Sequence, residues 1–241
     1  MKLLKNFYMK IKYKDLFKST LILSVPGVIS VFISLLSIPI HLNYAGSENY
    51  GNYIIFHFIL LISINFNFGI GKSTVISINN FPKKKQEIGF KAIKYTSNIS
   101  FIILIIFTLT QLLEYFSIYD LTKYYGFINY LLIGSIITIF FITLEGILQG
   151  NRKFKSISIF NLLFFSSSIA IPSFLLIFNQ DLTLENLIFI SISIKFFSVL
   201  LMFIFVSNNN LIKKFNNKIL IKNLNQNSKW ITLNNLLIQF Y

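Results

Sequence analysis

The chain has 241 residues, of which 54% are hydrophobic and only 12% are charged, and its formal net charge is +14. Soluble domains carry about 25% charged residues, so this composition excludes an ordinary soluble domain. The sequence contains no cysteine, which excludes disulfides, thiolate nucleophiles and cysteine-based metal sites.

The apolar residues fall into blocks of about 20 residues, the length that a helix needs to cross the hydrocarbon core of a bilayer. Backbone polar groups must be paired inside lipid, so each block is predicted to be a transmembrane helix. The first block is long and lacks a small-residue cleavage site, so we expect it to be retained. The predicted spans are Ser19–Leu42, Tyr50–Ile70, Tyr95–Phe116, Phe127–Leu148, Ile157–Phe178 and Leu184–Val206.

Basic residues are concentrated in every second connection between these spans. They cluster before the first span and after the second, fourth and sixth, whereas the other connections hold only Lys123 among acidic residues. By the positive-inside rule, the N-terminus and the ends of the even-numbered spans are predicted to be cytoplasmic in a bacterial inner membrane. The charge therefore indicates membrane topology, and no nucleic-acid partner is expected. The clusters comprise Lys2, Lys5, Lys10, Lys12, Lys14 and Lys18; Lys72, Lys83, Lys84, Lys85, Lys91 and Lys94; Arg152, Lys153 and Lys155; and Lys213, Lys214, Lys218, Lys222 and Lys229.

The predicted fold is an all-α integral membrane bundle. Short connections after the odd-numbered spans favour three antiparallel helical hairpins. Residues 1–206 are predicted to form a six-helix bundle, residues 207–229 a cytoplasmic linker, and residues 230–241 the start of a seventh helix. That last run is about half the length of a crossing. Pro26, Pro39 and Pro172 lie inside predicted spans and are expected to kink or loosen them.

Lys195 is the charged residue that stands out, because it lies in the middle of the sixth span. A central lysine costs roughly 2.5–3.5 kcal/mol on insertion scales, so we expect it to face the bundle interior or a wet cavity. The alternative is that its side chain snorkels to the interface. No paired carboxylates, Ser-His-Asp set or histidine cluster converges on one region. The sequence thus indicates neither an enzyme nor a metal or cofactor site.

Three other polar features have two interpretations each. Glu145, near the end of the fourth span, either contacts Arg152 or Lys153 at the interface or takes part in ion coupling. His57 and Asn65 are eight residues apart on one helix face, and either line a cavity or form interhelical hydrogen bonds. The run Gly69–Thr74 resembles part of a phosphate-binding loop, but Phe66 replaces a required glycine. We interpret that run as a helix end with Lys72 at the cytoplasmic interface.

Three segments resemble bacterial polysaccharide flippases. Gly46, Tyr50, Gly51 and Tyr53 match the Gly-x-x-x-Tyr-Gly-x-Tyr run that joins the first two helices of those proteins. The run Glu145–Phe154, with its Leu-Gln-Gly and Lys-Phe elements, is similar to the end of their fourth helix. The run Ser228–Thr232 is similar to the start of their seventh helix. The order of these segments agrees over nearly the whole chain.

The resemblance is to O-antigen and capsule flippases of the multidrug/oligosaccharidyl-lipid/polysaccharide exporter superfamily. It implies a two-lobed transporter that moves a lipid-linked oligosaccharide between leaflets by alternating access. This sequence would be the N-terminal lobe, in contact with membrane lipids and a C-terminal lobe that is missing here. From their charge and position, we expect Lys195, His57 and Asn65 to line the substrate cavity, with Lys72 and Arg152 near its cytoplasmic mouth and Glu145 as a coupling candidate. The alternatives are a drug or small-cation exporter of the same superfamily, and a membrane-embedded sugar polymerase or glycosyltransferase.

Overall fold

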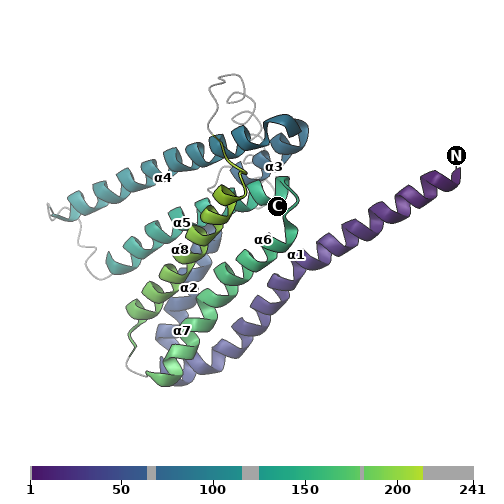
Figure 1. The fold of residues 1–241 in the computed structure, drawn as a ribbon. Helices are drawn as coiled ribbons and strands as arrows, with labels where there is room; N and C mark the ends of the chain where they lie inside the picture. The colour runs from purple at the N-terminus through teal and green to yellow at the C-terminus, as the bar shows by residue number, and fades with distance from the viewer. Residues whose placement is uncertain (1, 64–68, 116–124, 180–181, 214–241) are drawn as a thin grey trace, which may run out of the picture.

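A computed structural model describes residues 2–63, 69–115, 125–179 and 182–213, and every regular element in this part of the chain is helical. The elements run in the order shown in Figure 1. Their bounds are α1 Lys2–Tyr44, α2 Ser47–Ser63, α3 Ile70–Asn80, η2 Pro82–Lys84, α4 Lys85–Tyr115, α5 Tyr125–Gly150, α6 Phe154–Asn161, η4 Leu162–Ser166, α7 Ser167–Phe178 and α8 Leu184–Asn208.

The chain is a multi-pass membrane protein. Among the described residues, five helices are long and apolar enough to cross a bilayer. They are Phe17–Tyr44, Pro82–Ile106, Ile128–Gly150, Phe154–Phe178 and Leu184–Asn208. The predicted second span, Tyr50–Ile70, is not among them, because α2 is described over only 17 residues. Most of the predicted linker and the whole of the predicted seventh run lie outside the described residues.

The segment after α2 differs from the prediction. The run Gly69–Thr74 was interpreted as a helix end, but it opens a new helix, α3, which begins after Gly69 in the left-handed region (φ 65°). Helix α4 begins at Lys85 and not at Tyr95, since its polar first turns are also helical and hold a 2.7 Å ion pair between Lys91 and Glu87. Apolar length alone misses such turns, because a helix can continue past the hydrocarbon into the polar interface.

Helix α5 lies at the centre of the bundle and packs against α2, α3, α4, α6 and α8. Its contact with α3 is backbone to backbone: a Cβ at Gly146 would lie 2.5 Å from the carbonyl oxygen of Gly71. On another face, the Phe141 ring stacks on Phe164 with centroids 3.9 Å apart. Small residues and stacked rings are the contacts by which helices associate in lipid, where water does not drive them together.

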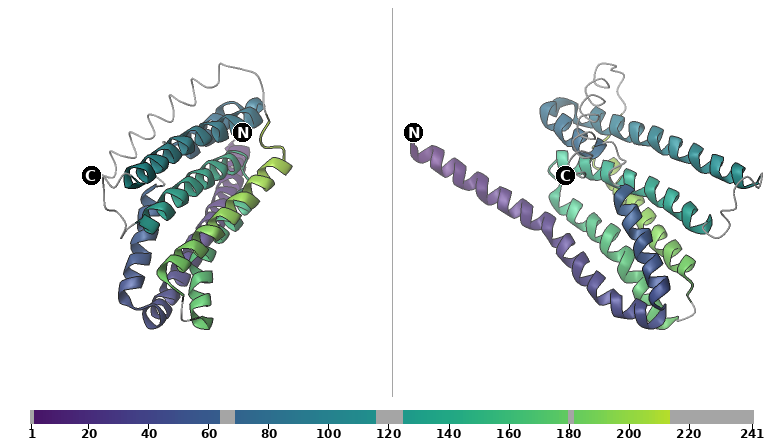
Figure 2. Two further views of the ribbon diagram at one scale, coloured as in Figure 1. Left: turned by 90° about the vertical axis from the view of Figure 1, so that its left-hand side faces the viewer. Right: turned by 180° about the vertical axis from the view of Figure 1, so that it is seen from behind.

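The first predicted hairpin is splayed. Helix α1 packs along α6, η4 and α7, whereas α2 packs against α5 and α8. The two helices diverge from the turn that joins them, and the N-terminal part of α1 extends away from the bundle (Figures 1 and 2). The expected hairpins α4–α5 and α7–α8 do pack as pairs. The divergence of α1 from α2 leaves space inside the lobe.

The fifth span is interrupted, although not at its proline. A π-helical turn, η4, separates α6 from α7 and precedes Pro172. Helix α1 continues through both Pro26 and Pro39. The extra residue of a π turn rotates the side chains that follow it, and such turns are frequent at functional sites.

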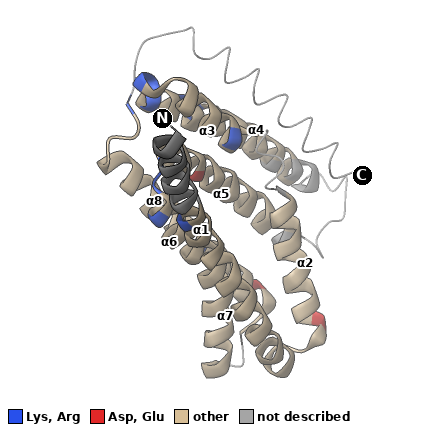
Figure 3. Ribbon diagram, turned by 90° about the vertical axis from the view of Figure 1, so that its right-hand side faces the viewer, with Lys and Arg blue, Asp and Glu red and all other residues tan. Residues whose placement is uncertain are grey.

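Most basic residues gather at one end of the bundle. Figure 3 shows lysine and arginine gathered toward one end, while Glu48 and Glu185 lie in the first turns of α2 and α8. At the basic end, the segment Asn209–Lys213, which follows α8, is hydrogen-bonded to the start of α4. Gln86 Nε2 donates to the Asn210 carbonyl over 2.7 Å, and the Lys213 amide donates to the Gln86 carbonyl over 3.2 Å.

The close approach of α3 to α5 generates a stability prediction. Gly146→Ala places a methyl group against the Gly71 carbonyl, so the helices must separate. We expect the free energy of unfolding to fall by about 1–3 kcal/mol, the usual range for overpacking. The measurement is the melting temperature, followed by size-exclusion chromatography of heated samples. Gly51→Ala is the control, because nothing lies within 4 Å of its Cβ position. Equal melting of the two variants would contradict the packing described.

Candidate functional site

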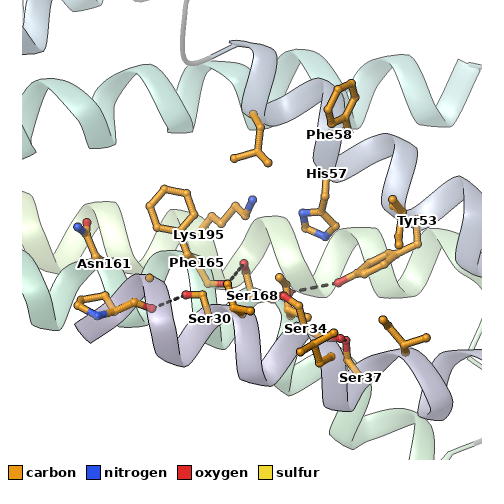
Figure 4. A pocket seen from close by; sticks show the side chains of 18 of the residues that line it. Ser30, Ser34, Ser37, Tyr53, His57, Phe58, Asn161, Phe165, Ser168 and Lys195 are labelled. Atoms are coloured by element: carbon orange, nitrogen blue, oxygen red, sulfur yellow. Dashed lines mark hydrogen bonds between the residues drawn. The ribbon is translucent and has the colours of Figure 1, made fainter. Parts of the chain in front are cut away.

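A cavity of about 670 Å³ fills the space between the diverging helices α1 and α2 and the wall formed by α6, α7 and α8. Figure 4 shows its polar side chains converging from these elements. The lining residues are Leu23, Pro26, Gly27, Ser30, Val31, Ser34, Leu35, Ser37, Ile38, Tyr50, Tyr53, Ile54, His57, Phe58, Leu61, Asn161, Phe165, Ser168, Ile169 and Lys195.

Helix α1 contributes a stripe of hydroxyl groups to the cavity. Ser30, Ser34 and Ser37 recur at spacings of four and three residues, so they share one helix face. Ser30 Oγ lies 2.7 Å from Ser166 Oγ of η4, which joins α1 to the interrupted fifth span. Other lining positions on α1, such as Val31 and Leu35, are apolar. The wall can therefore contact both hydrocarbon and polar groups.

Helix α2 contributes a column of rings. Tyr53 is only 3% exposed, and its hydroxyl donates to the Ser168 carbonyl over 3.2 Å. Its ring lies 4.9 Å from the His41 ring on one side and 4.5 Å from the His57 ring on the other, centroid to centroid. His57 Nε2 is 3.4 Å from Ser191 Oγ of α8. His57 thus both lines the cavity and makes the interhelical contact considered above.

Lys195 is the charged side chain that lines the cavity. It is 5% exposed, and its Nζ lies 5.3 Å from the centre of the Phe164 ring. No carboxylate or hydrogen-bonding group of the described residues pairs with it. The face of an aromatic ring offsets only part of the cost of burying an ammonium group. An ammonium in this position can bind an anion that enters the cavity.

Glu145 makes a different contact from the one expected. Its Oε1 accepts from Asn161 Nδ2 over 3.1 Å, and within the described chain it pairs with neither Arg152 nor Lys153. Arg152 lies in a left-handed turn (φ 59°), and its side chain and that of Lys153 are exposed. Glu145 is therefore one contact removed from the cavity, through Asn161.

The remaining predicted site residues do not line the cavity. Lys72 is exposed on α3, and Arg152 is exposed in the turn after α5. Asn65 lies outside the described residues. Within the described ranges, no group of three or more His, Cys, Asp or Glu residues could hold a metal ion. The structure thus brings Lys195 and His57 together and leaves the other predicted cations at the basic end of the bundle.

Several lining residues were missed by the sequence analysis, namely Ser30, Ser34, Tyr53, Asn161 and Ser168. A signal was available for two sets of them. The serines of α1 repeat on one face, as do Tyr50, Tyr53 and His57 of α2. Asn161 and Ser168 gave no such signal, because the π turn between them breaks the helical register.

The cavity can be tested by introducing a thiol into this cysteine-free chain. Ser34→Cys, in the lining, should react with a small charged methanethiosulfonate reagent. Leu36→Cys is the control, because Leu36 is 69% exposed but does not line the cavity. A thiol in hydrocarbon stays protonated and unreactive, so we expect a rate ratio on the order of tenfold or more. Equal labelling rates in membranes would argue against a wet cavity.

Comparison with known proteins identifies the fold. No family model matches the chain, and no curated protein matches it. An outward-facing multidrug resistance MATE family transporter of the MOP superfamily is 15% identical, with a TM-score of 0.63 over 92% of this chain and 54% of its own. A MOP superfamily transporter from Pyrococcus furiosus is also 15% identical, with a TM-score of 0.64 over 92% of this chain and 54% of its own. The chain spans about half the length of these proteins, and over that length it has the fold of MOP superfamily transporters.

Proposed function

We propose that the chain forms the cavity-bearing lobe of a transporter that flips a lipid-linked oligosaccharide across the bacterial inner membrane. The observation that carries the proposal is Lys195, a buried lysine without a carboxylate partner in the described structure, facing a cavity inside the membrane. Intramembrane charges that face a cavity mark substrate or ion pathways. A polyprenyl diphosphate linkage is the kind of anion that such a lysine binds.

The charge of the cavity favours an anion over a cation. Among the described residues that line it, none is Asp or Glu. Two unit charges 4 Å apart interact by about 4 kcal/mol at an effective dielectric constant of 20. A cationic drug would be repelled by Lys195 by an energy of that order, whereas a phosphate group would be attracted by it.

The walls of the cavity suit an amphiphile. Apolar residues of α1 and α2 provide surface for a hydrocarbon chain, and the hydroxyls of Ser30 and Ser34 offer hydrogen bonds to a sugar. Because α1 and α2 diverge and pack on different helices, the cavity between them can admit a substrate that would be too large for a closed pocket. These features support a lipid-linked sugar more than a small inorganic ion.

A drug exporter is the competing candidate, because one neighbour of the same fold is a multidrug resistance transporter. The Pyrococcus furiosus neighbour, however, is reported to have a binding pocket of reverse polarity that suggests a different function. Pocket charge can therefore differ between transporters of this fold. The unpaired Lys195 favours the flippase. The neighbours are transporters, which also favours transport over a polymerase or glycosyltransferase activity.

A complete transporter would need more than this lobe. We propose that a second lobe completes the pathway, since the solved transporters are about twice as long. With the N-terminus in the cytoplasm, Lys72 and Arg152 would attract the anionic substrate at the basic end of the bundle. Glu145, linked to the cavity through Asn161, stays our candidate for ion coupling.

The proposal is tested by binding to the chain in nanodiscs of zwitterionic lipid, with farnesyl diphosphate as the probe. Lys195→Met removes the ammonium but keeps the side chain's length. Hydrogen bonds to charged groups contribute about 1.5–3 kcal/mol, so we expect the dissociation constant to rise by roughly 10- to 100-fold. Lys195→Arg should retain most of the affinity.

Lys155→Met is the matched control, because Lys155 is exposed and lies outside the cavity. It should bind the probe as the wild type does. Equal affinity of Lys195→Met and wild type, or tighter binding of the cation ethidium than of the diphosphate, would refute the proposed substrate class.

A further inference from the structure

We infer that an anion entering this cavity is accompanied by a proton, and that the imidazole of His57 accepts it. The inference rests on the proposed anion site at Lys195 and adds a second basic group to it. It assigns to His57 a role that neither the fold nor the comparisons provide.

The two basic groups share one cavity. His57 comes from α2 and Lys195 from α8, and both side chains line the same space. Figure 4 shows the Lys195 chain extending toward the His57 ring. The His57 ring is held by Ser191 Oγ at 3.4 Å from Nε2 and by the edge-on Tyr53 ring, so its position relative to Lys195 is set by two contacts.

Other ionisable groups around His57 are few. On neighbouring elements, the basic side chains around His57 are Lys195 of α8, which lines the same cavity, and His41 of α1, whose ring stacks on Tyr53. Tyr53 and Tyr50 lie on its own helix, and Tyr130 of α5 packs against the surrounding apolar cluster. In the part of the chain that the structure describes, no carboxylate lines the cavity, and Glu145 is linked to it through Asn161. Within the described residues, nothing acidic is available to neutralise a second positive charge.

This arrangement links protonation to anion binding. Without an anion, a protonated His57 and a charged Lys195 repel each other in a medium of low dielectric constant, so the imidazole stays neutral. An anion between them is attracted to both charges and removes the penalty. A proton from the aqueous phase then adds to the unprotonated ring nitrogen of His57, and the imidazolium formed donates an N–H to the anion. One negative charge enters together with one positive charge.

The proton can be counted without any substitution. The chain in zwitterionic nanodiscs is titrated with octyl sulfate, whose charge is constant near neutral pH, by calorimetry in two zwitterionic buffers of different ionisation enthalpy. Empty nanodiscs give the background. The difference in heat should correspond to uptake of about one proton per anion, and affinity should fall up to about tenfold per pH unit above neutrality. Binding with no proton uptake overturns the inference and leaves the anion site standing.

The two histidines of the chain provide matched variants. His57→Gln keeps a side chain that can bond Ser191 but cannot be charged, so proton uptake and the pH dependence of affinity should disappear. His41→Gln should keep both, because His41 is 0% exposed, bonds Ser173 Oγ at 3.0 Å and does not line the cavity. Uptake that persists in folded His57→Gln, or is lost in His41→Gln, overturns the assignment.

Binding measurements with other anions distinguish a failure of the proton link from a failure of the proposed function. If the wild type binds neither octyl sulfate nor farnesyl diphosphate, the anion site itself fails. If inorganic sulfate binds as tightly as octyl sulfate with the same proton uptake, the proton link is supported but the amphiphilic substrate is not. Binding of octyl sulfate alone, with a proton, supports both.

Discussion

The contact of α5 with its neighbours is the interaction on which the rest of this lobe depends. Helices in lipid are not driven together by water, so they associate where backbones or rings can approach closely. Helix α5 supplies both kinds of contact, with Gly146 against Gly71 of α3 and Phe141 against Phe164 of η4. It also packs on α2, α4 and α8. Helices α2, α3, α4, α6 and α8 are all positioned by contacts with this central helix.

Helix α1 is placed differently, and the cavity follows from that difference. It has no contact of this kind with α5 and packs instead along α6, η4 and α7. Between α1 and the α5-centred group, the cavity is lined by Tyr53 and His57 of α2 and by Lys195 of α8. The buried ammonium would be unfavourable in a dry core, and the serine hydroxyls of α1, although bonded within the protein, can accept further hydrogen bonds. The same groups are suited to a space that admits water or a polar ligand.

Much of the fold could be predicted from composition and pattern. Apolar blocks of membrane-spanning length and alternating basic connections indicated an all-α membrane bundle, because lipid leaves few other options. Ends of helices were less predictable. Helix α3 and the first turns of α4 are polar or mixed in sequence, and hydropathy does not separate a helix at the interface from a loop. The π turn was not predictable either, because no residue in Leu162–Ser166 demands it.

The part of the site that could be predicted was the part fixed by the chemistry of a single residue. A lysine in mid-span has few stable locations, so the burial of Lys195 could be predicted from its position. Lys72 and Arg152 were grouped with it by charge, but charge does not show which face of the bundle a residue occupies. The hydrogen bond between Glu145 and Asn161 joins α5 to α6 across the turn at Arg152, and that turn was not predictable because non-glycine residues rarely adopt a left-handed conformation.

The segment Asn209–Lys213, which follows α8, affects how that helix can move. Its hydrogen bonds to Gln86 tie one end of α8 to the start of α4. A helix of 25 residues is about 37 Å long. A rod tied at one end pivots there, and its displacement grows with distance from the tie. Lys195 lies near the middle of the rod, so any tilt of α8 would carry its ammonium about half as far as the free end at Leu184, while the basic end stays in place.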